Sequence, residues 1–324
     1  MHRIAVLTSG GDSPGMNAAI RAVVRAGVHY DLEVLGVRRG YQGLIDDDMR
    51  VLDIRSVNGI LGRGGTVLGS ARCPAFRERA GRDRALANLR DRGVDGLIVI
   101  GGDGTYAGAH ALVEESGLPV VGLPGTIDND LFGTDYTIGF DTATNTVVEA
   151  VDKIRDTASS HDRLFFVEVM GRDTGFIAVR TGVASGAVEI LVPETTATPA
   201  DVADVLNAAR DRGKTSNIVI VAEGDQTGGA EQLARDVSDL TGNTYDTRVT
   251  VLGHLQRGGS PTCFDRILAS ELGVAAVEAL HDGVTDSTLG RERRDIRITP
   301  FAEAIGRRKD IDQGLLRIRS ILSA

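Results

Sequence analysis

The amino-acid sequence predicts an α/β protein made of two doubly wound lobes, each a three-layer α/β/α arrangement around a mainly parallel sheet. Short β-branched runs alternate with stretches of helical periodicity along the chain, which is the pattern of βαβ units. The runs are apolar throughout, as is typical of strands that helices cover on both faces.

The predicted strands are the runs Ile4–Leu7, Glu33–Val37, Leu97–Ile100, Val120–Leu123, Leu164–Val169, Val188–Val192, Ile218–Ala222 and Val249–Leu252. The predicted helices lie between them, at Asn17–His29, Arg82–Arg92, Tyr106–Glu115, Ala143–Thr157, Pro199–Arg212 and Ala230–Leu240. Glycine-containing turns follow strands in both halves of the chain, and ligands of open α/β sheets bind outside the carboxyl ends of the strands. We therefore expect two lobes that face one cleft, with a boundary near Gly139–Asp141.

The composition argues against several classes of function. The chain has 324 residues, enough for two cores, and a net charge of −9, whereas a nucleic-acid-binding protein usually carries a basic face. Its two cysteines form no CxxC motif, which favours a reducing, cytoplasmic setting over a disulfide framework or a zinc site. We expect no signal peptide and no membrane span, because no apolar run approaches about 18 residues.

The most informative run is Pro124–Asp130, which follows an apolar stretch and contains Thr126, Asp128, Asn129 and Asp130. A positioned carboxylate there can accept the proton of an attacking hydroxyl. The alternative is a simple Asx-turn, which would not need two aspartates around an asparagine. The run therefore predicts a general base for phosphoryl transfer to a hydroxyl.

A second turn, Gly101–Thr105, ends the preceding predicted strand. Its glycines allow the backbone to approach polyphosphate, and Asp103 is a hard oxygen ligand suited to Mg²⁺. An N-cap aspartate is the alternative, but a cap does not need these glycines. The earlier turn Gly10–Gly15 has the N–H groups of an anion site, and a plain strand-to-helix turn is an equal interpretation there.

Arginines recur near these turns, and their guanidinium forks suit phosphate oxygens. We expect Arg172 and Arg257, which adjoin glycines at strand ends, to do more than cover a solvated face. Glu223 and His254 also end strands, and His254 is expected to contact a sugar hydroxyl or a phosphate. A solvated helix face is the interpretation for Arg82, Arg84, Arg90 and Arg92.

Six segments together resemble the bacterial 6-phosphofructokinase family: LTSGGDSPGMNAAIR, RGGTVLGSARC, IGGDGTY, PGTIDNDLFGTDYTIGFDTA, SSHDRLFFVEVMGR and TVLGHLQRGGSP. The resemblance implies transfer of the γ-phosphoryl group of ATP to the 1-hydroxyl of fructose 6-phosphate, with Mg²⁺, as in glycolysis. It also implies a nucleotide-binding lobe at residues 1–139 plus 257–305 and a sugar-phosphate-binding lobe at 140–256 plus 306–324.

The resemblance implies roles for individual residues. Asp128 is the base, Thr126 and Arg172 assist at the transferred group, and Arg72 bridges the nucleotide and the sugar phosphate, while Asp103 holds Mg²⁺. The residues implied to line ATP are Gly11, Tyr41, Arg72, Cys73, Gly102, Asp103, Gly104, Thr105 and Gly108. Those implied to line the sugar phosphate are Thr126, Asp128, Asp130, Met170, Gly171, Arg172, Glu223, His254 and Arg257.

The resemblance also implies a homotetramer, because Arg163 and Arg248 would reach the sugar phosphate of a neighbouring subunit. A second family pocket, which binds ADP or phosphoenolpyruvate, is matched only by Arg21, Arg25, Arg155, Arg212 and Lys214. The departures from its pattern are Ile54, Gly59, Val188 and Thr215. Glu189 lies one residue from the position of the effector-site glutamate. A shift of one residue along a strand turns the side chain to the opposite face of the sheet. We therefore expect a weakened or altered response to Mg-ADP.

Two glycines favour ATP over pyrophosphate as the phosphoryl donor. Pyrophosphate-using relatives carry an acidic side chain where this chain has Gly104 and a lysine where it has Gly125. A pyrophosphate-dependent phosphofructokinase is the alternative. A non-catalytic regulatory subunit of the same fold is another, although Asp103, Asp128 and Arg172 are all present. A lipid or NAD kinase would share the Gly101–Thr105 turn but would not explain Met170-Gly171-Arg172.

Overall fold

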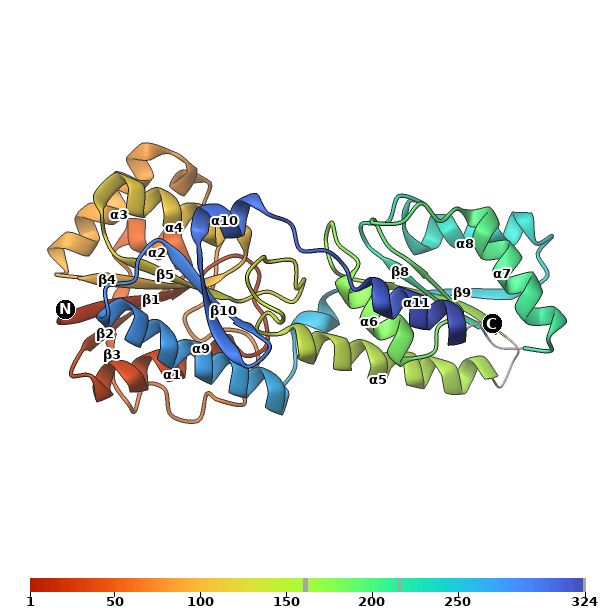
Figure 1. Cartoon of the computed structure of the whole chain (residues 1–324), viewed down its shortest axis with the longest axis horizontal. Helices are drawn as coiled ribbons and strands as arrows, with labels where there is room; N and C mark the ends of the chain where they lie inside the picture. Colours follow the sequence, from red (N-terminus) through yellow and green to blue (C-terminus); the bar gives the residue numbers. More distant parts are fainter. Residues whose placement is uncertain (160–162, 215–216, 323–324) are drawn as a thin grey trace. The chain divides into compact units, whose positions relative to one another are not determined.

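The computed structural model describes residues 1–159, 163–214 and 217–322 (Figure 1). Their contacts divide the chain into two compact units. The first unit comprises residues 1–127, 131–142 and 257–309, and the second comprises residues 128–130, 143–256 and the described residues from 310 on. The lobe boundaries proposed from the sequence stay a prediction.

The first unit contains a seven-stranded sheet in the order β11-β10-β5-β4-β1-β2-β3. Its strands are β1 (Arg3–Thr8), β2 (Glu33–Val37), β3 (Met49–Leu52), β4 (Gly96–Gly101), β5 (Val120–Pro124), β10 (Ser287–Glu292) and β11 (Asp295–Pro300). The five central strands run parallel, whereas β3 and β11 are antiparallel strands at the two edges.

Helices cover both faces of this sheet (Figure 1). On one face, α1 (Met16–His29) and α9 (Cys263–His281) pack around Ile4 and Val6 of β1. On the other face, Ala5 and Leu7 of β1 pack with α2 (Gly40–Asp46), α3 (Arg79–Asp91), α4 (Asp103–Ser116), α10 (Phe301–Gly306) and the 3₁₀ helix η1 (Pro74–Arg77). Successive side chains of a strand point to opposite faces, so the continuous apolar run of β1 fills two separate cores.

The second unit contains a four-stranded parallel sheet in the order β7-β8-β6-β9. Its strands are β6 (Arg163–Val169), β7 (Glu189–Leu191), β8 (Asn217–Ala222) and β9 (Asp246–Val251). One face packs against α7 (Pro199–Asp211) and α8 (Gly229–Leu240). Figure 1 shows α5 (Phe140–Ser159), α6 (Phe176–Ala184) and α11 (Gln313–Leu322) on the opposite side of the sheet. A 3₁₀ helix, η2 (Gly253–Arg257), follows β9.

The predicted fold class is confirmed, since both units are α/β with mainly parallel sheets, and each predicted strand and helix overlaps an observed one. The sequence patterns missed β3, β10, β11, α2, α6, α9, α10 and α11. The two edge strands were missed because their outer side chains, among them Val51 and Ile298, are exposed, so they lack the apolar continuity of a central strand. No helix in the described part of the chain is long and apolar enough to cross a membrane.

Candidate active site

Three predicted turns meet at the carboxyl edge of the first unit's sheet, after β1, β4 and β5. The backbone N–H of Ser9 donates to the carbonyl of Ile100 (3.0 Å), and that of Gly125 donates to the carbonyl of Gly101 (3.0 Å). A Cβ atom at Gly101 would lie 2.5 Å from the carbonyl oxygen of Ser9, so only glycine permits this approach. The parallel strands therefore bring together the turns that the sequence assigns to phosphate binding.

Asp103 lies exposed in the first turn of α4, whose N-cap is Gly102. The N-terminus of a helix carries a partial positive charge that favours phosphate. Mg²⁺ is commonly held by one or two carboxylates together with substrate phosphates. Within the described residues, no group of three His, Cys, Asp or Glu side chains gathers to hold a metal. Asp103 therefore fits a Mg²⁺ ion whose other ligands are mainly phosphate oxygens and water.

Tyr41 of α2 joins the predicted nucleotide residues to one another. Its ring stacks on Phe76 of η1, with centroids 4.0 Å apart and an interplanar angle of 12°. Its hydroxyl donates to the carbonyl of Thr105 (2.5 Å), and burial raises the pKa of Tyr41, so the hydroxyl keeps its proton. A Cβ atom at Gly108 would lie 2.8 Å from the Tyr41 ring, which explains the glycine there.

The segment before η1 carries two further predicted nucleotide residues. The thiol of Cys73 is half-buried and donates to Oε1 of Gln42 on α2 (3.3 Å), and desolvation raises its pKa. Arg72 beside it is exposed. Cys73 therefore contacts the same helix that carries Tyr41, and the exposed side chain of Arg72 is accessible to a phosphate.

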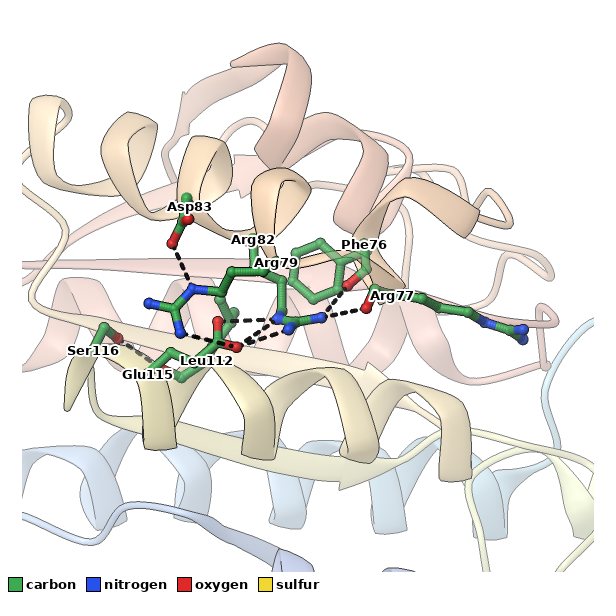
Figure 2. A network of polar contacts seen from close by, with 8 residues as sticks. All are labelled: Phe76, Arg77, Arg79, Arg82, Asp83, Leu112, Glu115 and Ser116. Atoms are coloured by element: carbon green, nitrogen blue, oxygen red, sulfur yellow. Dashed lines mark hydrogen bonds and ion pairs between the residues drawn. The ribbon is translucent and has the colours of Figure 1, made fainter.

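The prediction that Arg82 lies on a solvated helix face is wrong. Its Nη2 donates to Glu115 of α4 (2.7 Å), and its Nη1 donates to the carbonyls of Phe76 (2.9 Å) and Arg77 (2.7 Å), as Figure 2 shows. Only 15% of the Arg82 side chain and 13% of the Glu115 side chain are exposed. The ion pair therefore ties η1, with its stacked Phe76, to α4. Arg84, Arg90 and Arg92 are exposed, as predicted.

The turn after β5 is buried. The exposed fractions are 8% for Thr126, 3% for Asp128 and 4% for Asn129, and Asp130 is half-buried. Asn129 has a φ of 55°, a left-handed conformation that asparagine tolerates better than most residues. The Thr126 carbonyl accepts a hydrogen bond from the hydroxyl of Thr137 (2.6 Å). The predicted base therefore sits in a turn that the surrounding backbone fixes.

In the second unit, the turn Met170–Arg172 follows β6 in an unusual conformation. Gly171 has a φ of 146° and Arg172 a φ of 54°. The carboxylate of Glu223 accepts the N–H groups of Gly171 (3.3 Å) and Arg172 (2.7 Å). Gln256 accepts the N–H of Met170 (3.1 Å). The structure thus brings Glu223 to the predicted sugar-phosphate turn.

Gln256 itself is a residue that sequence reasoning missed. It is fully buried, and its Nε2 donates to the carbonyl of Gly253 (3.0 Å). Its place between His254 and Arg257 was the available signal. His254 is exposed on η2, whereas Arg257 belongs to the first unit and donates from Nη1 to the carbonyl of Asp12 (3.1 Å). Arg257 therefore lies against the glycine turn that follows β1.

Arg163 and Arg248 bind the same carboxylate within this chain. Nε of Arg163 lies 2.9 Å from Oδ2 of Asp246, and Nη1 of Arg248 lies 2.6 Å from Oδ1. Arg163 begins β6, whereas Met170 follows its end. At about 3.3 Å per residue, this strand separates the two residues by roughly 20 Å. The second unit therefore does not bring Arg163 to its own Met170–Arg172 turn.

The predicted effector residues are divided between the units. Arg21 and Arg25 lie on α1 in the first unit, and Arg155, Arg212 and Lys214 lie in the second. Partial desolvation lowers the pKa of Lys214, and the neighbouring guanidinium groups of Arg155 and Arg212 lower it further. These three cations therefore lie close enough together to favour an anion. Thr215 lies outside the described residues.

Val188 and Glu189, at the position of the family's effector-site glutamate and next to it, both have buried side chains. Val188 is buried in the hydrophobic core with Leu191. The carboxylate of Glu189 is buried elsewhere, where it forms an ion pair with Arg319 of α11 (2.8 Å from Oε2 to Nη1). Neither side chain is therefore available as an exposed ligand for a cation.

Comparisons with known proteins place this chain in a family. The phosphofructokinase family model matches residues 3–280. A Thermus thermophilus protein named ATP-dependent 6-phosphofructokinase 1 is 56% identical over 323 residues, which cover 100% of each chain. A Halalkalibacterium halodurans protein named ATP-dependent 6-phosphofructokinase is 50% identical over 323 residues, with the same coverage.

A solved structure of phosphofructokinase from Saccharomyces cerevisiae has a TM-score of 0.86 to this chain at 41% sequence identity. The match covers 94% of this chain and 45% of the yeast chain, so this chain spans less than half the length of that relative. The chain belongs to the phosphofructokinase family.

Proposed function

We propose a residue-level mechanism for this chain, which is an ATP-dependent 6-phosphofructokinase: it phosphorylates the 1-hydroxyl of fructose 6-phosphate to give fructose 1,6-bisphosphate in glycolysis. The full-length bacterial relatives described above carry that name. The observation that carries the mechanism is the buried carboxylate of Asp128 in a fixed turn just after β5. A carboxylate in such a turn is well placed to remove one proton from an attacking hydroxyl.

In the proposed reaction, Asp128 accepts the proton of the sugar hydroxyl as its oxygen bonds to the γ-phosphorus. The bond from that phosphorus to the bridging oxygen breaks, and ADP leaves. Thr126 and Arg172 donate hydrogen bonds to the transferred group, and Arg72 binds both phosphates. Mg²⁺ supplies neutralising charge to the phosphates when it is bound, and Asp103 would hold it.

The nucleotide and the sugar phosphate are proposed to bind the residue sets that the sequence predicted. On the nucleotide side, the stacking of Tyr41 on Phe76 supports the proposal, because it fixes the wall beside Gly108. On the sugar side, the two N–H groups that Glu223 accepts support it, because they hold Arg172 in its left-handed conformation. The remaining contacts of Asp130, His254 and Arg257 are part of the same proposal.

ATP rather than pyrophosphate is the donor that the glycines support. A Cβ atom at Gly104 would have no neighbour within 4 Å, so this position leaves open space beside α4. A Cβ atom at Gly125 would lie 2.8 Å from Cγ2 of Ile100 and 3.1 Å from Cε of Met16. A lysine at 125 would therefore require the core beneath it to shift, and this chain has no cationic side chain at that position.

The test of the mechanism is the variant Asp128→Ser. Loss of a positioned base should lower kcat at least ~10²–10⁴-fold, while KM for ATP changes little. The matched control is Asp135→Asn, an exposed aspartate further along the same loop, for which turnover should stay within about twofold of the wild type. Near-normal turnover in a folded Asp128→Ser protein would show that Asp128 is not the general base.

A homotetramer with shared active sites is also proposed. The support is the position of Arg163 and Arg248: both bind Asp246 near the amino ends of β6 and β9, away from the Met170–Arg172 turn of the same chain. These guanidinium groups are suited to serve the sugar phosphate of a neighbouring subunit. Sedimentation equilibrium would detect the tetramer, and a monomer with full activity would contradict it.

A weakened response to Mg-ADP is proposed for the second anion pocket. The basic side chains of Arg155, Arg212 and Lys214 are present as partners for a phosphate, but Glu189 is engaged by Arg319. A large leftward shift of the fructose 6-phosphate saturation curve by ADP would contradict this proposal.

A cytoplasmic location is proposed as well, and the two free cysteines, Cys73 and Cys263, support it.

A further inference from the structure

Asp265 is a buried carboxyl group that the proposed mechanism does not use. It lies in the first turn of α9 and has no exposed surface. Its Oδ1 accepts the backbone N–H of Gly139 (2.9 Å). Its Oδ2 accepts the backbone N–H of Thr142 (2.8 Å) and the hydroxyl of the same residue (2.5 Å). Asp265 therefore binds the start of α5, more than one hundred residues earlier in the chain.

Two further hydrogen bonds join the starts of α9 and α5, and a third lies within the N-cap of α9. The N–H of Asp265 donates to the hydroxyl of Thr262, the N-cap of α9 (3.2 Å). That hydroxyl donates to the carboxylate of Asp141 (2.8 Å), and the N–H of Thr262 donates to the hydroxyl of Thr142 (3.0 Å). Because each helix start satisfies polar groups of the other, residues 139–142 are held firmly against α9.

The residues just before this segment pair with the predicted catalytic turn. The N–H of Ile138 donates to the carbonyl of Pro124 (2.7 Å), and Ile138 forms a parallel β-bridge with Gly125. The hydroxyl of Thr137, which is fully buried, donates to the carbonyl of Thr126 (2.6 Å). Thr137 and Ile138 thus pair with the start of the turn that carries Asp128, through one isolated β-bridge and one side-chain hydrogen bond.

The glycine turn after β1 packs against Ile138 and Asp265. A Cβ atom at Gly15 would lie 2.7 Å from Cγ2 of Ile138 and 3.6 Å from Cβ of Asp265. The residues that Asp265 holds therefore lie beneath two of the turns that meet at the carboxyl edge of the sheet.

We propose that Asp265 is a positioning residue for phosphoryl transfer. Its carboxylate fixes residues 139–142, these fix Thr137 and Ile138, and Thr137 in turn fixes Thr126 at the start of the catalytic turn. This inference rests on the proposed roles of Thr126 and Asp128. Misplacement of reacting groups by about 1 Å can cost roughly 10²-fold in rate, so Asp265 acts on kcat more than on substrate binding.

The first test is Asp265→Asn in the full chain. The amide oxygen can still accept a hydrogen bond, but its NH₂ group would face an N–H donor of Gly139 or Thr142. We expect kcat to fall ~10–10²-fold, with KM for ATP and for fructose 6-phosphate each changed less than about threefold. An unchanged kcat in a folded Asp265→Asn protein would overturn the inference.

The matched control is Asp95→Asn. Asp95 also accepts two backbone N–H groups in the first unit, those of His2 and Arg3, but it is exposed and contacts no part of the catalytic turn within the described structure. Its kcat should stay within about twofold of the wild type. A comparable fall in kcat for Asp95→Asn would show a general effect of losing such a carboxylate and would overturn the inference.

A second pair of variants keeps the inference testable if Asp265→Asn fails to fold. Thr137→Val keeps the shape of the side chain and removes its hydroxyl, whereas Thr137→Ser keeps the hydroxyl. We expect kcat to fall ~10-fold in the valine variant and to stay within about twofold in the serine variant. Equal kcat values for the two variants would overturn the inference.

Asp128→Ser in the same assay separates this inference from the proposed function. If Asp128→Ser loses turnover and both Asp265→Asn and Thr137→Val keep it, the positioning role is wrong and the mechanism stands. If the wild type itself does not phosphorylate fructose 6-phosphate, both are wrong.

Discussion

Two carboxylates, Glu115 and Asp265, lie on opposite faces of the first unit's sheet and differ in the partners that stabilise them. Glu115 of α4 pairs with Arg82, which in turn donates to the carbonyls of η1. Asp265 of α9 accepts only N–H and O–H donors, and no cationic side chain pairs with it among the residues that the structure describes. Glu115 is therefore stabilised by an ion pair, whereas Asp265 is buried and is stabilised only by neutral hydrogen-bond donors.

The difference determines which protonation state each site favours. The hydrogen bond from Arg82 lowers the pKa of Glu115 below its ordinary 4.5. At Asp265, burial and, to a smaller extent, the negative charge of Asp141 outweigh the three hydrogen bonds and raise the pKa from 3.8 to about 6. Neutral donors thus offset only part of the cost of burying a charge, whereas a guanidinium group more than offsets it.

The pH dependence of stability should therefore have opposite signs at the two sites. A lowered pKa means that the folded state favours the charged carboxylate, so the contribution of Glu115 is present at neutral pH and is lost as the pH falls below 4.5. A raised pKa means that the folded state favours the protonated form, so Asp265 contributes most below its ordinary pKa and this contribution is lost as the pH rises towards 6.

The largest effect is expected from breaking the ion pair. Arg82→Ala leaves the part-buried Glu115 without its main cation and leaves the Phe76 and Arg77 carbonyls without their donor. The free energy of unfolding should fall by about 3–4 kcal/mol, towards the lower end of the range for buried pairs. Urea denaturation at pH 7 measures this loss.

Arg79→Ala is the matched control for Arg82→Ala. Arg79 lies 3.5 Å from the same carboxylate, but 60% of its side chain is exposed, so its removal should lower the free energy of unfolding far less than the removal of Arg82. Equal losses for the two variants would show that the network in Figure 2 does not depend on the buried pair.

The next effect concerns Asp265 and requires a pH series. Between about pH 4 and pH 6, the wild type should lose stability relative to Asp265→Asn, by at most about 3 kcal/mol for the shift from 3.8 to about 6. The reason is that only the wild type must ionise a buried carboxyl group over this range. Urea denaturation of both proteins at half-unit pH steps measures the difference, and parallel profiles would refute the raised pKa.

The predictions that the sequence allowed came mainly from the apolar runs of the central strands and from the residues of the turns that follow them. The runs before Gly101 and Gly125 are apolar on both faces, so they indicated central parallel strands, and the turns after them had to share one edge of the sheet. The edge strand β11 could not be predicted in the same way, because Ile296 and Ile298 are exposed and alternate with polar residues.

Contacts between residues far apart in the sequence were beyond the reach of these patterns. Thr262 and Asp265 have the spacing of a helix N-cap, which could have revealed the start of α9 but not the bonds from Asp265 to Gly139 and Thr142. Arg82 belongs to a cluster of arginines with helical spacing, which suggested a solvated face. Only the packing of α3 on α4 brings it to Glu115.

The most direct test of the central claim is the turnover of the purified wild-type chain on fructose 6-phosphate with Mg²⁺ and either ATP or pyrophosphate. A coupled assay for fructose 1,6-bisphosphate gives kcat/KM for each donor under the same conditions. The open space at Gly104 and the closely packed Gly125 predict that ATP is used and that pyrophosphate supports little or no turnover. Faster turnover with pyrophosphate, or none with ATP, would contradict the account.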